Sequence, residues 1–307
     1  MSSMNVFIDG QAGTTGLQLE ERLRKRCDIS LLEIDPALRK DATARKALMD
    51  KADVVFLCLP DDEARKAAAM ASPNVLVIDA STAHRTACDW VYGLPELSAQ
   101  HRQRLTQSKR IAVPGCHAAG FISLVYPLIV AGVVNKAAQL NCTSLTGYSG
   151  GGKAMIADYE TDRTPGDKLS APRPYALGLT HKHLPEMQTV CGLHHPPHFM
   201  PVVGNMERGM LVSVPMWANN KTEIWQLLNN HYSGSSFISV MPLDYELDNG
   251  FLDPTVCNGT NRMELFVFGH DTQVLLVARH DNLGKGASGA AVQCMNIACD
   301  LDETTGL

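Results

Sequence analysis

The sequence predicts an α/β protein built from two domains, and three observations carry this prediction. The chain has 307 residues, about the length of two ordinary domains. Its first third alternates short apolar strands with helical segments, the pattern of βαβ units and a parallel sheet. From about residue 117 the pattern changes, and later strands alternate or pair like an antiparallel sheet. We therefore expect a parallel-sheet domain and an α+β domain with a mixed or antiparallel sheet.

In the first domain, apolar runs and their flanking residues define the expected elements. Short apolar runs rich in β-branched residues predict strands over 5–9, 29–34, 53–59, 75–79 and 111–113. Apolar residues at helical spacing among charged ones predict helices over 13–26, 41–51 and 61–71. Residues 82–110 are less regular.

In the second domain, the expected elements begin with an apolar helix over 118–130. Strands are expected over 211–214, 264–269 and 273–279. The chain then returns to the first domain. Residues 286–299 are rich in Ala, Gly and Met at helical spacing, which predicts a buried helix that closes this domain. We place the first domain at 1–115 plus 281–307 and the second at 116–280.

Composition excludes several classes of protein. A net charge of −5 without a basic block argues against a nucleic-acid partner. No apolar run reaches the roughly 20 residues of a membrane span, and the first residues lack a leader pattern. The nine cysteines are scattered, without a CxxC pair, which fits neither a disulfide framework nor a zinc ribbon. We expect a cytoplasmic enzyme that does not bind membranes.

A glycine loop follows the first predicted strand and opens a helix. Gly10, Gly13 and Gly16 have the spacing G-x-x-G-x-x-G, a loose match to the dinucleotide fingerprint. Glycines there allow a tight turn and let backbone amides approach a pyrophosphate, which also gains from the helix N-terminus. The loop therefore indicates a nucleotide cofactor.

The end of the second strand leaves the choice of coenzyme open. Glu33 and Asp35 are suited to a ribose 2′-hydroxyl and would favour NAD. Arg39 and Lys40 are suited to a 2′-phosphate and would favour NADP. The residues alone point both ways.

Cys116 is the candidate nucleophile. It follows Pro114-Gly115 at the end of a strand and begins a helix. Unpaired amides and the helix dipole stabilise a thiolate at such a position, so the thiol becomes nucleophilic near neutral pH. The other eight cysteines are interpreted as ordinary core or surface residues.

Five of the eleven histidines fall between residues 181 and 198. We expect no metal site, because acidic partners are poorly placed and no H-E-x-x-H motif occurs. His183 precedes Pro185-Glu186, and a nearby carboxylate can orient an imidazole for general acid–base work. Pro185 disfavours helix at Leu184, which predicts an extended or turn conformation there. Geometry does not separate His181 from His183, and we choose His183.

The order of motifs resembles the short-form N-acetyl-gamma-glutamyl-phosphate reductases of the semialdehyde dehydrogenase superfamily, over nearly the whole chain. The motifs that carry the resemblance are Gly10–Gly16, Ser81–Arg85, Tyr92–Glu96, Pro114–Cys116, Ser149–Gly152, His181–Glu186, Arg208–Gly209, Gly259–Asn261 and Asp281–Ala287, followed by Gln293 and Asn296. Two departures stand out. His117 to Ala119 replace the aromatic, small and threonine residues of the long form, and Thr14 and Thr15 replace a common serine and tyrosine.

The resemblance implies a Rossmann-type domain completed by the C-terminal helix, with an inserted α+β domain. It implies NADP as cofactor, a small acyl-phosphate substrate, a place in arginine biosynthesis and a homodimer or homotetramer. It assigns Cys116 as nucleophile and His183 as acid–base. Cofactor contacts are expected from Gly10, Gly13, Thr14, Thr15, Gly16, Ser81, Asn282, Gly284 and Lys285. Substrate or phosphate contacts are expected from Arg85, Glu186 and Arg208.

Four other functions are considered. Aspartate-semialdehyde dehydrogenase and aminoadipyl-phosphate reductase share the thioester chemistry. A catalytically silent nucleotide sensor would keep the glycine loop without turnover. A cysteine hydrolase would use the Cys/His pair but leaves the glycine loop unexplained.

Overall fold

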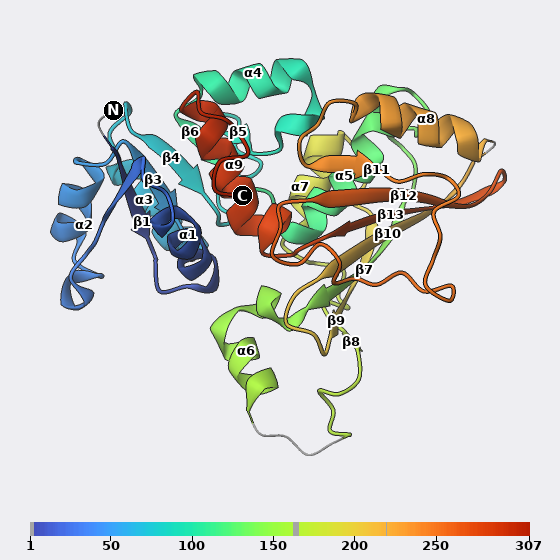
Figure 1. Ribbon diagram of the computed structural model, residues 1–307, viewed down its shortest axis with the longest axis horizontal. Helices are drawn as coiled ribbons and strands as arrows, with labels where there is room; N and C mark the ends of the chain where they lie inside the picture. Colours follow the sequence, from blue (N-terminus) through green and yellow to red (C-terminus); the bar gives the residue numbers. More distant parts are fainter. Residues whose placement is uncertain (1–2, 162–165, 219) are drawn as a thin grey trace. The chain divides into compact units, whose positions relative to one another are not determined.

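The computed structural model describes residues 3–161, 166–218 and 220–307, which form two compact units (Figure 1). The first unit runs to Gly115 and resumes over Ala287–Leu307, and the second is Cys116–Gly286. Residues 281–286, which the sequence analysis placed in the first domain, belong to the second unit. Within the described residues, no helix is both long and apolar enough to span a membrane.

The first unit contains a six-stranded sheet in which every pair of neighbours is parallel, in the order β2-β1-β3-β4-β6-β5. Its strands are β1 (Met4–Asp9), β2 (Ile29–Leu32), β3 (Val54–Leu57), β4 (Leu76–Asp79), β5 (Val91–Tyr92) and β6 (Arg110–Ala112). Strands buried on both faces read as continuous apolar runs, which is why β1, β3 and β4 were predicted, whereas the two-residue strand β5 was not.

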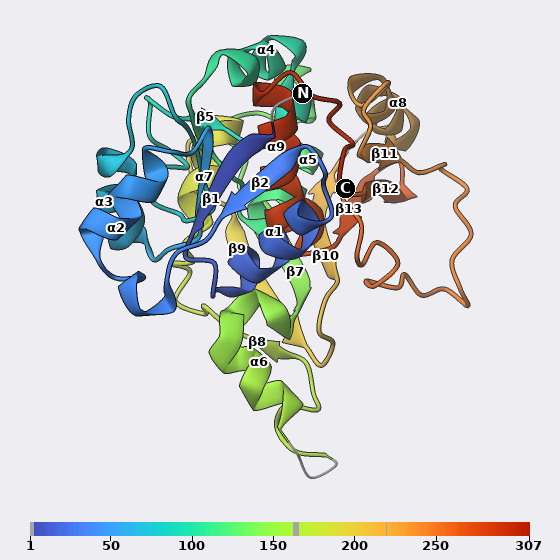
Figure 2. The ribbon, with the colours of Figure 1, turned by 60° about the vertical axis from the view of Figure 1, so that its left-hand side comes forward.

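Helices cover both faces of this sheet (Figure 2). They are α1 (Thr14–Arg24), α2 (Ala42–Met49), α3 (Asp61–Met70), α4 (Ala99–Gln107) and α9 (Gly289–Ala298), with short turns η1 (Pro36–Leu38) and η2 (Pro95–Leu97). Val6 and Ile8 of β1 belong to a core shared with α1 and α9, whereas Phe7 belongs to a core shared with α2 and α3. Successive strand residues thus point to opposite faces, and the C-terminal helix packs on this sheet as predicted.

The second unit contains a seven-stranded mixed sheet in the order β11-β12-β13-β10-β7-β9-β8. The β11/β12 and β7/β9 pairs are parallel and the other pairs antiparallel. Its strands are β7 (Asn141–Gly147), β8 (Arg173–Pro174), β9 (His198–Gly204), β10 (Met210–Trp217), β11 (Ile238–Val240), β12 (Met263–His270) and β13 (Gln273–His280). The predicted combination of a parallel and a mixed sheet is confirmed.

Helix α5 packs on strands β10 and β13 of this sheet, with α7 and α8 beside it. The helices of the unit are α5 (Cys116–Val130), α6 (Gly152–Glu160), α7 (Leu184–Cys191) and α8 (Lys221–His231), with a short 3-10 helix η3 (Tyr148–Gly151). A short π-helix, η4 (Gly284–Ser288), begins at the end of the unit. Almost every residue of α5 is buried, as its apolar sequence predicts.

The structure contains elements that were not expected: strands β5, β7, β8, β9 and β11 and helices α4, α6, α7 and α8. Helix α4 lies within residues 82–110, where no element was expected. The extended or turn conformation expected at Leu184 is wrong, because α7 begins at that residue. Pro185 falls in the first turn of α7, where its missing N–H has no helical partner to lose.

Candidate active site

Cys116 is the first residue of α5 and is half-buried. Cys58 and Cys299 are also half-buried, but neither begins a helix. Burial raises the pKa of the thiols of Cys58, Cys142, Cys191 and Cys257, and Cys27 and Cys88 are exposed. Cys116 therefore combines partial access with a helix start, the setting that stabilises a thiolate.

His280 anchors the backbone of Cys116. Its Nε2–H donates to the Cys116 carbonyl oxygen across 3.0 Å. Its ring is fully buried, and burial lowers its pKa to about 4, so it is neutral near pH 7. Gly120 makes room for it, because a Cβ there would lie 3.0 Å from His280 Cε1 and 2.6 Å from Val212 Cγ2. His280 is not recognisable from the sequence as part of the site, since only the folding of β13 brings it to α5.

Two histidines lie beside the Cys116 thiol. The Cys116 sulfur and one ring nitrogen each of His117 and His183 lie within 4.8 Å of one another. The side chain of His183 is buried at the turn that leads into α7. In an unliganded site this spacing suits a general base, because catalytic hydrogen bonds often tighten only when substrate binds.

His181 occupies a different place from His183. Its Nδ1 accepts the backbone N–H of His183 across 3.1 Å, so it stabilises the turn that presents His183. The centres of the two rings lie 4.7 Å apart and nearly perpendicular. His194, His195 and His198 of the histidine-rich segment are exposed.

The Cys116, His117 and His183 cluster has the proximity of a metal-ligand set, but its hydrogen bonds favour another interpretation. Both ring nitrogens of His117 are engaged by hydroxyls, Nδ1 with Ser144 Oγ at 2.7 Å and Nε2 with Tyr175 Oη at 2.9 Å. A metal would have to displace one of these contacts. We therefore treat the cluster as a nucleophile with its polar surroundings.

The loop after β13 is tied to other loops of the second unit. Asn282 accepts the Gly209 N–H and donates to Ser149 Oγ, both across 3.0 Å. Lys285 is fully buried, with its ammonium 5.7 Å from the centre of the Phe237 ring. A Cβ at Gly284 would lie 2.1 Å from the Thr260 carbonyl oxygen. Asn282, Gly284 and Lys285 thus hold this loop together, and their predicted cofactor contacts stay predictions.

Two predicted substrate residues also lie in the second unit. Glu186 is buried in the first turn of α7. Arg208 Nε donates to Glu207 across 3.0 Å, and the Arg208 carbonyl accepts from Asn258.

In the first unit, the glycine loop has the shape of a phosphate cradle. Gly10 has a φ of +89°, and a Cβ there would lie 2.3 Å from the Cys58 carbonyl oxygen. A Cβ at Gly16 would lie 2.6 Å from the Gly10 carbonyl oxygen. Helix α1 begins at Thr14 without a side-chain cap or an acidic residue in its first turn. Thr14 Oγ1 is buried and has no hydrogen-bond partner in the described part of the chain. These features fit a bound phosphate.

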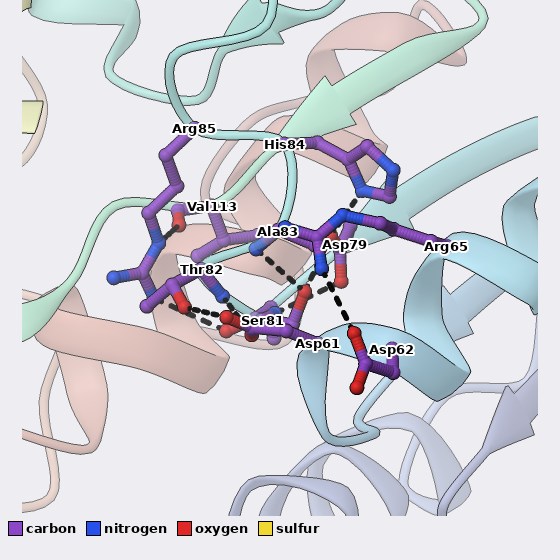
Figure 3. A network of polar contacts seen from close by, with 11 residues as sticks. Asp61, Asp62, Arg65, Asp79, Ser81, Thr82, Ala83, His84, Arg85 and Val113 are labelled. Carbon is purple, nitrogen blue, oxygen red and sulfur yellow. Dashed lines mark hydrogen bonds and ion pairs between the residues drawn. The ribbon is translucent and has the colours of Figure 1, made fainter. Parts of the chain in front are cut away.

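A polar network surrounds Ser81 at the carboxyl end of β4 (Figure 3). The fully buried Asp79 carboxylate accepts the Ser81 N–H and hydroxyl and contacts His84 Nδ1 at 2.6 Å. The His84 ring stacks on Trp90, with ring centres 4.0 Å apart. Asp61 accepts the backbone N–H and hydroxyl of Thr82. The network gives residues 81–85 a fixed conformation.

Two backbone carbonyls hold the guanidinium of Arg85. Its Nε donates to the Val113 carbonyl at 2.9 Å and its Nη2 to the Ala80 carbonyl at 3.1 Å (Figure 3). These bonds place the guanidinium at the carboxyl ends of β4 and β6. Its role as a phosphate ligand stays a prediction.

A cationic cavity of about 440 Å³ lies in the first unit and is lined by Arg39, Lys40, Arg45, Leu59 and Glu63. Arg45 is buried and forms an ion pair with Asp9 at the end of β1, across 2.6 Å. Arg45 is not recognisable from the sequence as a cavity residue, because a charged residue on a helix is usually solvated.

The acidic residues that would favour NAD are engaged elsewhere. Glu33 pairs with Arg24 across 2.6 Å. Asp35 caps η1 by accepting the Ala37 N–H.

Two family models match the chain. Residues 21–105 match the semialdehyde dehydrogenase NAD binding domain, and residues 116–282 match the semialdehyde dehydrogenase dimerisation domain. Among solved structures, aspartate semialdehyde dehydrogenase II from Vibrio cholerae covers 98% of this chain and 99% of its own, with a TM-score of 0.70 at 17% identity. Aspartate semialdehyde dehydrogenase with NADP from Candida albicans covers 96% and 98%, with a TM-score of 0.64 at 16% identity. At such identities the likeness concerns the fold.

Curated relatives are much closer in sequence. N-acetyl-gamma-glutamyl-phosphate reductase 2 from Nostoc sp. is 44% identical, with 100% of both chains covered. The N-acetyl-gamma-glutamyl-phosphate reductase of Rhizobium meliloti is also 44% identical, over 95% of this chain and 97% of its own. The second such reductase of Pseudomonas putida is 45% identical, over 95% and 96%. The chain therefore belongs to the N-acetyl-gamma-glutamyl-phosphate reductases, within the semialdehyde dehydrogenase family.

Proposed function

We propose that the protein reduces N-acetyl-L-glutamyl 5-phosphate to N-acetyl-L-glutamate 5-semialdehyde with NADPH, releasing phosphate, as a step of arginine biosynthesis. The observation that carries this proposal is the half-buried Cys116 thiol at the start of α5, with a His183 nitrogen within 4.8 Å. It occurs in a chain that is 44% identical along its whole length to a reductase of that name.

Cys116 acts as the nucleophile. His183 takes the thiol proton, and the thiolate attacks the acyl carbon and expels phosphate, which leaves an acyl thioester on the sulfur. NADPH, when bound, supplies the hydride that reduces this acyl group. The thiolate of Cys116 is then the leaving group that frees the aldehyde. His183 keeps the proton it took from the thiol close to the oxygen that becomes negative when hydride is added. It returns this proton to the Cys116 sulfur once the aldehyde has left.

The residues of the first unit fit NADPH. The glycine loop, the first turn of α1 and the buried Thr14 hydroxyl are suited to the pyrophosphate. Thr15, in the first turn of α1, and Ser81, after the end of β4, are further predicted contacts. The cavity lined by Arg39, Lys40 and Arg45 is suited to a 2′-phosphate.

The contacts of Glu33 with Arg24 and of Asp35 with the η1 backbone weaken the argument for NAD. We therefore assign NADP as the coenzyme on the charges of this cavity as well as on family membership.

Arginine residues are suited to the substrate anions. A guanidinium offers parallel donors to phosphate or carboxylate oxygens. We assign Arg85 to the leaving phosphate and Arg208, with the buried Glu186, to the rest of the substrate.

The second unit is suited to self-association. One face of its sheet is covered by α5 and its neighbours, while Met200, Trp217 and Leu275 are exposed on strands β9, β10 and β13. Their exposed fractions of 45%, 79% and 37% are large for apolar side chains. We propose a homodimer or homotetramer formed through this domain.

The cysteines support a cytoplasmic location. All nine are free thiols, which fits the reducing cytoplasm.

One assay distinguishes the alternatives. Phosphate-dependent reduction of NADP is measured with N-acetyl-glutamate 5-semialdehyde and, in parallel, with aspartate semialdehyde. The proposal expects a specificity constant at least ~100-fold higher for the acetylated substrate, because buried polar groups left unpaired by the wrong substrate are costly. A preference for aspartate semialdehyde would contradict it. Stoichiometric NADPH binding without turnover of either substrate would identify a silent nucleotide sensor.

A further inference from the structure

His117 stands at the centre of a buried hydrogen-bond chain beside the nucleophile. It directly follows Cys116 in α5, and only 2% of it is exposed. Its Nδ1 lies 2.7 Å from Ser144 Oγ on β7, and its Nε2 lies 2.9 Å from Tyr175 Oη. Phe199 packs against its ring at a centre-to-centre distance of 5.2 Å. The proposed mechanism uses none of these contacts.

The imidazole of His117 is neutral at physiological pH. Burial lowers its pKa well below the usual value, and the nearby His181, His280 and Lys182 act in the same direction. His183, whose ring centre lies 5.4 Å away, also faces it. A neutral imidazole has one N–H donor and one acceptor nitrogen. One of the two hydroxyls must therefore donate a hydrogen bond to the ring, and the other must accept one from it.

The hydrogen bond with Ser144 determines which ring nitrogen of neutral His117 carries the proton. The side chain of Ser144 is fully buried, and within the described residues its hydroxyl contacts only His117 Nδ1. A buried hydroxyl proton without an acceptor is costly. Ser144 therefore donates to Nδ1, the ring proton lies on Nε2, and Nε2–H donates to Tyr175 Oη.

Tyr175 is thereby left as a donor. The Nε2–H of His117 occupies an acceptor position of the phenol oxygen, so the phenol proton must point away from His117. Burial and the charge of the Cys116 thiolate raise the pKa of Tyr175, which keeps the phenol protonated. The Tyr175 backbone is fixed by its N–H, which donates to the Pro201 carbonyl across 3.0 Å.

We propose that His117 is a positioning residue that holds Tyr175 as a hydrogen-bond donor to the reacting carbonyl oxygen of the acyl group on Cys116. This inference rests on the proposed function, because it names a further catalytic residue, Tyr175, for that reaction. The oxygen gains negative charge when the acyl carbon is attacked, and a fixed donor there stabilises the transition state more than the ground state.

Substitutions test the proposal through kcat and KM. Tyr175→Phe lowers kcat by ~100-fold with little change in KM, the usual effect of losing one such donor. His117→Phe lowers kcat similarly, and the double variant is no slower than either single one because both remove the same interaction. His117→Gln retains a side-chain N–H near the Nε2 position and keeps most of the activity. The exposed His195→Asn is the matched control.

Nuclear magnetic resonance of ¹⁵N-histidine tests the proton assignment without turnover. In the wild-type protein at pH 7, the expected His117 signals are those of the neutral Nε2–H tautomer, identified by their absence in His117→Gln. An Nδ1–H tautomer or an imidazolium would overturn the proposal. So would multiplicative kcat losses in the double variant of an active enzyme. A wild-type protein without reductase activity would refute the proposed function, whereas the tautomer would still show whether His117 donates its Nε2–H to Tyr175.

Discussion

His280 donates its Nε2–H to the backbone carbonyl of Cys116 across 3.0 Å, and this bond joins the end of β13 to the first residue of α5. The nucleophile is thus fixed from a distant part of the chain by a histidine that is itself fully buried. Because the acceptor is a carbonyl oxygen, the ring proton must lie on Nε2. This neutral, buried histidine has a consequence for acid stability.

The first prediction is that acid destabilises the protein in part through His280. Burial lowers its pKa to about 4 in the folded chain, whereas an unfolded histidine titrates near 6.5. As the pH falls through that window, the unfolded chain binds the proton first. The free energy of unfolding therefore decreases by a few kcal/mol between about pH 6.5 and pH 4, at roughly 1.4 kcal/mol for each pKa unit.

Urea unfolding at pH 7 and pH 5 measures this effect, with His280→Gln as the comparison. Glutamine can retain a donor to the Cys116 carbonyl but does not titrate, so the loss of stability between the two pH values should be smaller in the variant. His117 contributes to acid sensitivity in the same direction, since its pKa is also lowered. An identical loss in wild type and variant would show that His280 is not responsible.

The second prediction separates the two histidines before α7. His183 should carry the proton, because a nitrogen of its ring lies within 4.8 Å of the Cys116 sulfur. His183→Asn should lower kcat by ~10²- to 10⁴-fold and flatten the pH–rate limb near neutrality, with coenzyme binding intact. His181→Asn should cost less, since His181 acts through the His183 backbone. The reverse order of effects would show that the base is His181.

The third prediction is that the Thr14 hydroxyl contributes to cofactor binding but not to the stability of the unliganded protein. Its Oγ1 is buried without a protein partner in the described chain, so Thr14→Val removes an unsatisfied polar atom at nearly constant volume. The melting temperature of the unliganded protein should stay unchanged or rise, while the KM for NADPH should rise by about tenfold, the worth of one hydrogen bond. A lower melting temperature with an unchanged KM would contradict the assignment of this hydroxyl to the cofactor.

The fourth prediction concerns coenzyme preference. Arg39→Ala should raise the KM for NADPH by roughly 10- to 100-fold, because a hydrogen bond to a charged group is worth about 1.5–3 kcal/mol. The KM for NADH should change little. Lys46→Ala is the control, since Lys46 pairs with Asp50 on the solvent side of α2 and does not line the cavity. Equal effects on both coenzymes would place the 2′-phosphate elsewhere.

Local sequence patterns were sufficient for much of the architecture. The first sheet could be predicted because its strands are continuous apolar runs between amphipathic helices. Helix α7 could not, because Pro185 disfavours helix at the preceding residue unless the pair opens the helix. The position of Cys116 before an apolar helix was equally readable from the sequence.

The partners of the site residues depend on contacts between distant segments. His280 meets Cys116 through a separation of 164 residues, and Arg45 meets Asp9 through one of 36. No local pattern distinguishes such residues from an ordinary strand end or a solvated helix face. The same holds for His117, whose role became visible only with Ser144 and Tyr175 beside it.

The fifth prediction, that Cys116 is acylated during the reaction, tests the central claim most directly. The wild-type protein and Cys116→Ser are mixed with N-acetyl-L-glutamyl 5-phosphate in the absence of NADPH, and the intact mass and peptide masses are measured. We expect the wild-type chain to gain the mass of one N-acetylglutamyl group on the Cys116 peptide, and to lose it as semialdehyde when NADPH is added. Cys116→Ser should show no adduct and at least a thousandfold lower turnover. An adduct on another cysteine, or full turnover by Cys116→Ser, would contradict the account.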